Sequence, residues 1–156
     1  MSRFPTPTIA PGLMDRCPVH SLRERLRKAN LRPTRQRVAL GWLLFAKGDR
    51  HVTAEMLTDE ARAAKVPVSV ATVYNTLHQF TQAGLLAQVT IESGRVFFDT
   101  NVSPHHHFLI EETNELVDIP RGEVTVEKLP EAPQGFVASG FEVIVRLRKR
   151  EGGQTP

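Results

Sequence analysis

The sequence predicts an α+β protein whose N-terminal half is a winged helix-turn-helix domain, and three observations lead to that prediction. Four stretches with helical spacing of apolar residues each follow a capping residue. Two strand-like runs then flank a Glu92-Ser93-Gly94 turn. The charge is uneven, because residues 1–50 hold 11 Lys or Arg against 3 Asp or Glu, whereas residues 99–156 hold 6 against 10. A basic N-terminal part indicates a polyanionic partner, and a solvated basic helix face is the alternative.

The first three helices are expected from their caps and their apolar spacing. Ser21, Thr34 and Thr53 are the expected N-caps, with Ser21 opening a capping box. The first helix should end near Asn30 and the second at Gly48, and Val66-Pro67 should end the third. The residues expected to face the core are Leu22, Leu26, Ala29, Val38, Trp42, Phe45, Ala54, Leu57, Ala61 and Ala64.

The fourth helix, from a Ser69 cap to Ala83, predicts a DNA-reading element. Its apolar stripe is Val73, Leu77 and Phe80, and Gly84 should terminate it. The other positions carry uncharged hydrogen-bonding groups, namely Ser69, Thr72, Tyr74, Asn75, Thr76 and Gln79. Such groups suit base edges and phosphates, whereas a plain surface helix usually exposes Glu and Lys. The residues expected to bind DNA are Arg32, Arg35, Arg37, Ser69, Thr72, Tyr74, Asn75 and Arg95.

A histidine cluster follows this half of the chain, in the segment Pro104-His105-His106-His107. Alternate residues of a strand point to the same side, so His105 and His107 can converge on one cation while His106 faces away. A metal site is one interpretation, and a solvated polar strand entry is the other.

Four separated motifs resemble the Fur (ferric uptake regulator) superfamily in order and spacing over roughly residues 15 to 148. They are Leu31-Arg32-Pro33-Thr34-Arg35-Gln36-Arg37, His51-Val52-Thr53-Ala54-Glu55, Val70-Ala71-Thr72-Val73-Tyr74-Asn75-Thr76-Leu77 and Ala83-Gly84-Leu85. Within the superfamily, Pro104-His105-His106-His107-Phe108 and Asn75 look most like Irr, the iron response regulator of alphaproteobacteria. Other branches place arginine at the position of Asn75, so a different operator preference is expected.

The resemblance implies a winged-helix domain, a hinge and a small α/β dimerisation domain, with a regulatory metal site. The expected divisions are an arm at 1–14, the winged-helix domain at 15–98, the hinge at 99–104, the dimerisation and metal- or haem-sensing domain at 105–150, and a tail at 151–156. Carried over by position, the metal ligands are His51, Asp99, His105, His107 and Asp118. Imidazoles with carboxylates suit Fe(II), Mn(II) or Zn(II). A structural four-cysteine zinc is not expected, because Ile110 and Thr113 stand where many relatives have cysteines.

Haem is the second expected ligand. Cys17-Pro18 in an arm without periodicity could offer a thiolate to Fe(III) haem, and an incidental exposed cysteine is the alternative. The Irr resemblance favours haem binding through Cys17, with His20 as a second axial ligand, and separately through His105, His106 or His107. A solvated histidine is the alternative for His20.

The expected function is therefore an Irr-like, cytoplasmic transcriptional repressor of iron and haem homeostasis, not an enzyme, that binds inverted-repeat DNA as a homodimer. Haem and a haem-synthesis enzyme are further expected partners. The sequence contains no run of about 18 uncharged apolar residues, the pattern that would indicate a membrane segment. Two alternatives stay open: a haem buffer with a degenerate DNA-binding domain, and a His/Asp metalloenzyme, which would leave the winged helix unexplained.

Overall fold

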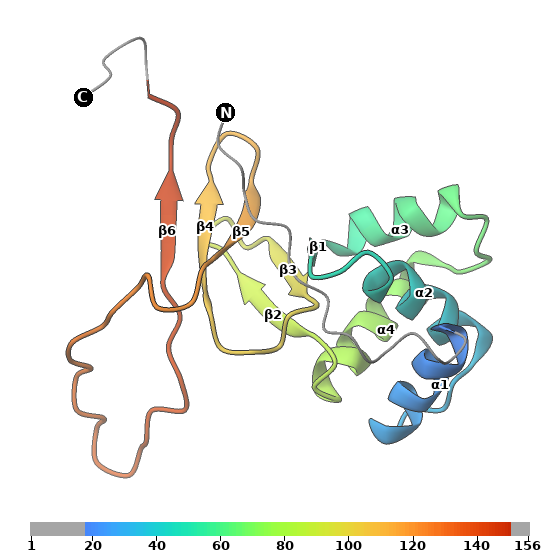
Figure 1. Cartoon of the computed structure of the whole chain (residues 1–156), viewed down its shortest axis with the longest axis horizontal. Coiled ribbons are helices and arrows are strands. Elements are labelled where there is room, and N and C mark those ends of the chain that lie inside the picture. The colour runs from blue at the N-terminus through green and yellow to red at the C-terminus, as the bar shows by residue number, and fades with distance from the viewer. Residues whose placement is uncertain (1–17, 151–156) are drawn as a thin grey trace. The chain divides into compact units, whose positions relative to one another are not determined.

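The computed structural model describes residues 18–150, in two compact units that divide after Val102 (Figure 1). Cys17 falls among residues 1–17, which, like residues 151–156, lie outside the described part. None of the helices in residues 18–150 has the length and apolar character that crossing a bilayer requires.

The first unit contains four helices: α1 (Pro18–Lys28), α2 (Arg35–Phe45), α3 (Ala54–Ala63) and α4 (Val70–Gln82). Three of the predicted N-caps are confirmed, since the side chains of Thr34, Thr53 and Ser69 accept hydrogen bonds from backbone amides of the first turn. The predicted cap at Ser21 is wrong, because α1 begins three residues earlier at Pro18. Proline suits the first position of a helix, where its missing N–H costs no hydrogen bond.

The helices enclose the core of the first unit, in which Leu26, Leu57 and Phe80 are fully buried. The predicted inward faces of α3 and α4 are confirmed except at Ala64, which is exposed, and at Thr76, which is buried rather than outward. Trp42 was also misassigned, since it is 42% exposed. The cause is that α2 carries apolar residues around most of its circumference, so spacing alone does not identify its inner face; the buried residues of α2 are Val38, Leu40, Gly41 and Leu44.

The predicted hairpin of the first unit is confirmed as β2 (Ala87–Thr90) and β3 (Val96–Asp99), an antiparallel pair. Gly94 has a φ of 78° in the turn, a conformation that glycine adopts without strain. The sequence did not predict β1 (His51–Val52), which pairs with the other edge of β3 and gives the order β1-β3-β2. Two residues are too few for a visible alternation of polar and apolar side chains.

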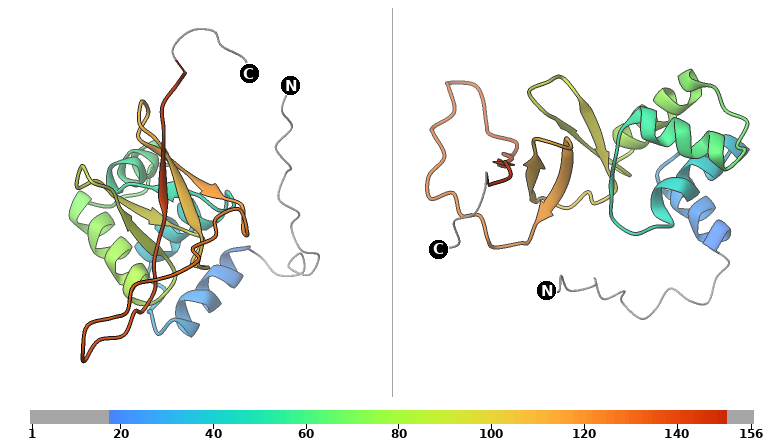
Figure 2. Two further views of the ribbon diagram at one scale, coloured as in Figure 1. Left: turned by 90° about the vertical axis from the view of Figure 1, so that its left-hand side faces the viewer. Right: turned by 90° about the horizontal axis from the view of Figure 1, so that it is seen from above.

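The second unit is built on β4 (His106–Ile110), β5 (Glu115–Ile119) and β6 (Ile144–Leu147), in the order β5-β4-β6. Strand β5 is antiparallel to β4, and β6 is parallel to it. Residues 120–143 form a long excursion between β5 and β6 (Figure 2), and within residues 103–150 the structure has no helix. The helical part of the expected α/β domain is therefore not found there. Prolines and glycines recur through the excursion and oppose a helix; they are Pro120, Gly122, Pro130, Pro133, Gly135 and Gly140.

Candidate nucleic-acid interface and metal-ligand clusters

The outer face of α4 presents the polar residues that the sequence assigned to DNA. Tyr74 and Asn75 are both exposed, and Asn75 lies on the side of α4 opposite the fully buried Val73 and Leu77. Ser69 caps the helix, and its side-chain oxygen accepts from the backbone N–H of Thr72 at 3.1 Å. The positive end of the helix dipole and these N-terminal donors suit a phosphate group. The geometry is that of a helix that can enter a major groove.

The predicted basic residues differ in how they are held. Arg32 and Arg35 are exposed near the start of α2, and Arg95 is exposed in the β2–β3 turn. Arg37 is more constrained, because its Nε and Nη2 donate to Gln79 Oε1 at 3.1 and 2.8 Å and its Nη1 donates to the carbonyl of Arg32 at 2.9 Å. Arg37 therefore joins α2 to α4. Beside it lies a polar pocket of about 240 Å³, lined by Thr34, Gln36, Arg37, Thr72, Asn75, Thr76 and Gln79.

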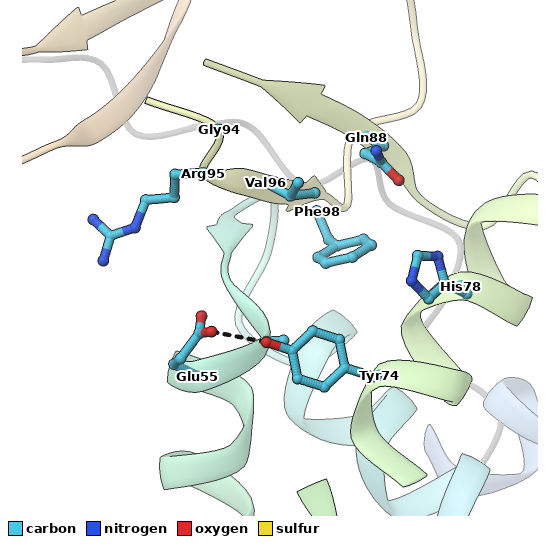
Figure 3. A pocket seen from close by; sticks show the side chains of 9 residues that line it. Glu55, Tyr74, His78, Gln88, Gly94, Arg95, Val96 and Phe98 are labelled. Carbon is cyan, nitrogen blue, oxygen red and sulfur yellow. Dashed lines mark hydrogen bonds between the residues drawn. The ribbon is translucent and has the colours of Figure 1, made fainter. Parts of the chain in front are cut away.

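Tyr74 has a partner that the sequence did not predict. Its hydroxyl donates to Glu55 Oε1 at 2.8 Å, from α4 to the first turn of α3 (Figure 3). This hydrogen bond raises the pKa of Tyr74 above its ordinary value. Hydrogen bonds from its own backbone amide, from Tyr74 and from Thr53 lower the pKa of Glu55, and attraction to Arg95 acts in the same direction. Glu55 is therefore a carboxylate at neutral pH, placed on the surface assigned to DNA.

Two of the predicted metal ligands lie together in the first unit. His51 on β1 and Asp99 on β3 are direct cross-strand partners. His51 Nε2 lies 3.3 Å from Asp99 Oδ2. Directly opposed residues of neighbouring strands hold their side chains close, so the β1–β3 pairing is what brings this histidine to this carboxylate.

The other three predicted ligands lie together in the second unit. His105, immediately before β4, and His107 on β4 lie on the same side of the chain, as predicted, with ring centroids 4.4 Å apart. Asp118 on β5 is the cross-strand partner of His107. Its Oδ1 lies 3.2 Å from His105 Nε2 and 3.6 Å from His107 Nε2. One ligand atom from each of the three residues therefore falls within 4.8 Å of the others.

Hydrogen bonds at the far side of both rings determine which nitrogen carries the proton. His105 Nδ1 lies 2.6 Å from the carbonyl oxygen of Ser103, and His107 Nδ1 lies 2.6 Å from Glu142 Oε1. Carbonyl and carboxylate oxygens only accept, so each Nδ1 is the donor. In a neutral imidazole this leaves the lone pair on Nε2, directed at Asp118, which is the form that ligates metals. The sequence did not predict Glu142, which is distant along the chain.

The remaining residues assigned to haem have other surroundings. His106 is on the opposite side of β4 from its neighbours, where its Nδ1 accepts from the backbone N–H of Val143 at 3.2 Å and its ring lies 5.5 Å from that of Phe141. His20, in α1, has its Nε2 3.3 Å from Glu24 Oε1. Cys17 lies outside the described residues. The structure thus separates His106 from the donors of His105 and His107.

Comparison with known proteins gives consistent results. The sequence profile of the ferric uptake regulator family matches residues 28–144. The ferric uptake regulation protein of Pseudomonas aeruginosa is 30% identical over 128 residues, which are 81% of this chain and 96% of that protein. A peroxide-responsive repressor PerR of Staphylococcus epidermidis is 36% identical over 103 residues, 64% of this chain and 67% of that protein.

Solved structures agree with these relatives at the level of the fold. The ferric uptake regulator from Pseudomonas aeruginosa with manganese matches with a TM-score of 0.61 and 26% identity, over 82% of this chain and 97% of that one. The Vibrio cholerae ferric uptake regulator matches with a TM-score of 0.62 at 19% identity, over 81% and 98%. The predicted fold class, α+β with N-terminal helices followed by a β-sheet domain, is confirmed.

Proposed function

The chain belongs to the ferric uptake regulator family, and we propose that it is an Irr-like repressor of iron and haem homeostasis that binds inverted-repeat DNA as a dimer. Membership of this family makes it a DNA-binding transcription regulator and not an enzyme. The relatives named above are Fur and PerR proteins, so assignment to the Irr group rests on Asn75 and the Pro104–Phe108 segment.

The exposed polar face of α4 is the observation that supports DNA binding most directly. In this proposal Tyr74 and Asn75 contact base edges, with Asn75 able to bond an adenine through two hydrogen bonds. Ser69 and Thr72 place the N-terminus of α4 on the backbone, while Arg32, Arg35, Arg37 and Arg95 neutralise phosphates.

Variants of two exposed residues separate these roles. Asn75→Ala should relax the preference at one base pair, at a cost of about 1–3 kcal/mol on the preferred site. Arg35→Ala should weaken binding to all sequences alike and reduce the salt slope of the binding constant by about one. Fluorescence anisotropy over a salt series measures both effects. The opposite result, with Arg35→Ala altering sequence preference, would mean that α4 is not the reading helix.

For the metal, we propose that His51 and Asp99 of the first unit and His105, His107 and Asp118 of the second serve one divalent cation. The donors fit this purpose, since both imidazoles of the second unit present Nε2 toward the Asp118 carboxylate. A mixed nitrogen and oxygen set favours Fe(II), Mn(II) or Zn(II). A cation that takes ligands from both units stabilises one arrangement of them, and DNA affinity then depends on the metal through that arrangement.

Haem is proposed as the second signal, bound through Cys17 with His20, and separately through the 105–107 cluster. His106 is the residue of that cluster proposed for haem, because it lies on the other side of β4 from the metal donors. Its Nδ1 accepts from the backbone N–H of Val143, so the ring must give up that hydrogen bond, or move its proton from Nε2, before it can ligate iron. Haem would supply an iron centre that takes an axial thiolate or imidazole. A metal site and separate haem sites would let the protein respond both to the divalent cation and to haem.

The test is anisotropy of a labelled inverted-repeat promoter fragment with the metal-free protein, then with Mn(II), then with haem. We expect tight binding to require Mn(II) and to weaken with haem. His107→Ala should abolish the Mn(II) dependence, whereas the matched His106→Ala should keep it and reduce the response to haem. Loss of a thiolate-type Soret band in Cys17→Ala would support the first haem site, and an unchanged band would exclude it. Binding that ignores both ligands would contradict the switch.

A further inference from the structure

The Glu55–Tyr74 hydrogen bond determines which hydrogen-bonding role Tyr74 can play toward a base. A phenol has one proton to donate and lone pairs to accept with. In this structure the proton is directed to Glu55 Oε1 at 2.8 Å. The hydroxyl of Tyr74 can then only accept from DNA, while its ring can contact a thymine methyl group.

Several features keep Glu55 in this position and in this charge state. Thr53 caps α3 and so orients its first turn, in which Glu55 lies. Glu55 and Tyr74 line one pocket of about 480 Å³ together with Arg95 of the β2–β3 turn (Figure 3). Arg95 extends from the hairpin on the side of Glu55, and its charge stabilises the carboxylate. The other residues at the pocket are Ala54, His78, Gln88, Gly94, Val96 and Phe98.

A carboxylate on a surface that meets phosphates carries a cost. It repels every DNA backbone irrespective of sequence, so it lowers the affinity for all sequences, specific and non-specific alike. The same carboxylate restricts Tyr74 to bases that offer a donor or a methyl group, and it disfavours guanine, whose major-groove edge carries only acceptors. Glu55 therefore combines a general repulsion with a selective contact.

We propose that Glu55 is a specificity-determining residue that acts through Tyr74, by holding the phenol as a hydrogen-bond acceptor at the base it contacts. This inference rests on the proposed DNA-binding function and extends it. It assigns base selection at one position to a residue of α3, outside the recognition helix α4. Donor-bearing or methyl-bearing base edges, such as those of adenine, cytosine and thymine in the major groove, are the expected targets.

The contact itself can be tested first, in the full-length protein. Tyr74 is the single tyrosine of the chain, so the tyrosinate absorbance reports this phenol alone. Glu55→Ala should shift the Tyr74 titration toward lower pH, because the ionised phenol no longer sits beside a carboxylate acceptor. Asp59→Asn removes a charge from the same helix without touching Tyr74, and its titration should match that of the parent protein. Identical titrations for the parent protein and Glu55→Ala would overturn the proposal.

The functional test selects binding sites from a duplex pool with a randomised centre, using Mn(II)-loaded protein. The parent protein and three variants are compared: Glu55→Ala, Tyr74→Phe and the double variant. Glu55→Ala should change the preference at one position and lower the ratio of specific to non-specific affinity about tenfold. In the Tyr74→Phe background, Glu55→Ala should leave the preferred base unchanged and raise the affinity for all sequences alike, because only the backbone repulsion is removed. If Glu55 had a purely structural role, Glu55→Ala would lower thermal stability but would not change the preferred base in a way that depends on the Tyr74 hydroxyl.

The outcomes separate the inference from the function on which it rests. A consensus that is the same for the parent protein and Glu55→Ala overturns the role of Glu55 and leaves the regulator intact. A parent protein that enriches no sequence overturns the proposed DNA-binding function and the inference with it, even where the Tyr74 titration confirms the contact. If Glu55→Ala still changes the preferred base in the Tyr74→Phe background, the effect belongs to Glu55 alone. That result overturns the role proposed for the phenol.

Discussion

Glu142 accepts the hydrogen bond of His107 Nδ1 and so orients the ring. Its effect on the tautomer of His107 should be measurable in the metal-free protein. Glu142→Gln replaces an acceptor-only carboxylate with an amide that can also donate, so the Nδ1 proton of His107 loses its exclusive partner. We expect mixed tautomers in the ¹⁵N spectrum of His107 and about a tenfold weaker affinity for Mn(II). Glu131→Gln removes the same charge from an exposed position of this unit and should change neither. Unchanged His107 tautomers would show that Glu142 is not its support.

Single residues were predictable where the relevant contact is local. The caps Thr34, Thr53 and Ser69 bond to amides three positions ahead, and His105 and His107 share a side of a strand by alternation alone. Glu142 and Glu55 were not predictable, because their partners are 35 and 19 residues distant. Those contacts depend on the register of β4 against β6 and on the placement of α3 against α4, which no local pattern encodes.

At the level of elements, a part-buried ion pair joins α3 to the residue that precedes β1. Arg50 Nη1 donates to Glu60 Oε2 at 3.0 Å and Nη2 bonds the other carboxylate oxygen, while the Arg50 backbone bonds Thr100. Hydrogen bonding to Arg50 lowers the pKa of Glu60 below its ordinary value of 4.5. A carboxyl with a lowered pKa stabilises the fold fully above its unfolded pKa and ceases to do so as the pH falls through its folded pKa.

Glu60→Gln should therefore reduce the free energy of unfolding at pH 7 by about 2 kcal/mol, because the charge-assisted bonds are lost. The difference in free energy of unfolding between Glu60→Gln and the parent protein should shrink as the pH falls below the ordinary pKa of glutamate. Asp59→Asn is the control, since its pair with Arg62 is largely exposed and should contribute little. Urea denaturation at neutral and acidic pH measures both variants. A difference that does not depend on pH would mean that the charge of Glu60 is not involved.

Element prediction succeeded where pattern and cap agreed, as in α3, α4 and the β2–β3 hairpin. It failed at α1, because the capping pattern at Ser21 gave a later start than Pro18, and at the inner face of α2, where Gly41 rather than a large side chain faces Leu22. A Cβ at Gly41 would lie 3.2 Å from Leu22 Cδ1, so close helix packing selects this face. The spacing of large apolar residues cannot reveal a contact such as this one, in which a glycine packs against the neighbouring helix.

On the scale of the whole molecule, the two units differ in how much apolar surface they bury. The main core cluster consists of residues from Leu22 to Phe98, all in the first unit. The second unit buries Leu109, Leu116 and Ile119, yet leaves Phe136 and Val137 73% and 90% exposed. Large exposed side chains of this kind are typical of a surface that a partner covers. The proposed homodimer would supply that partner, and single-chain sequence patterns do not specify which apolar residues it takes.

Two Phe→Ala variants distinguish a ring buried in the core from an exposed ring of the proposed dimer contact. Phe80→Ala removes a fully buried ring from the first unit and should lower its free energy of unfolding by about 3–5 kcal/mol. Phe136→Ala removes an exposed ring and should barely change that value, while it weakens self-association in sedimentation equilibrium. Equal association of Phe136→Ala and the parent protein would exclude Phe136 from the dimer contact. Because Phe80 lies in the unit that carries α4, its loss should also reduce DNA binding, whereas Phe136→Ala should do so only at protein concentrations at which the dimer dissociates.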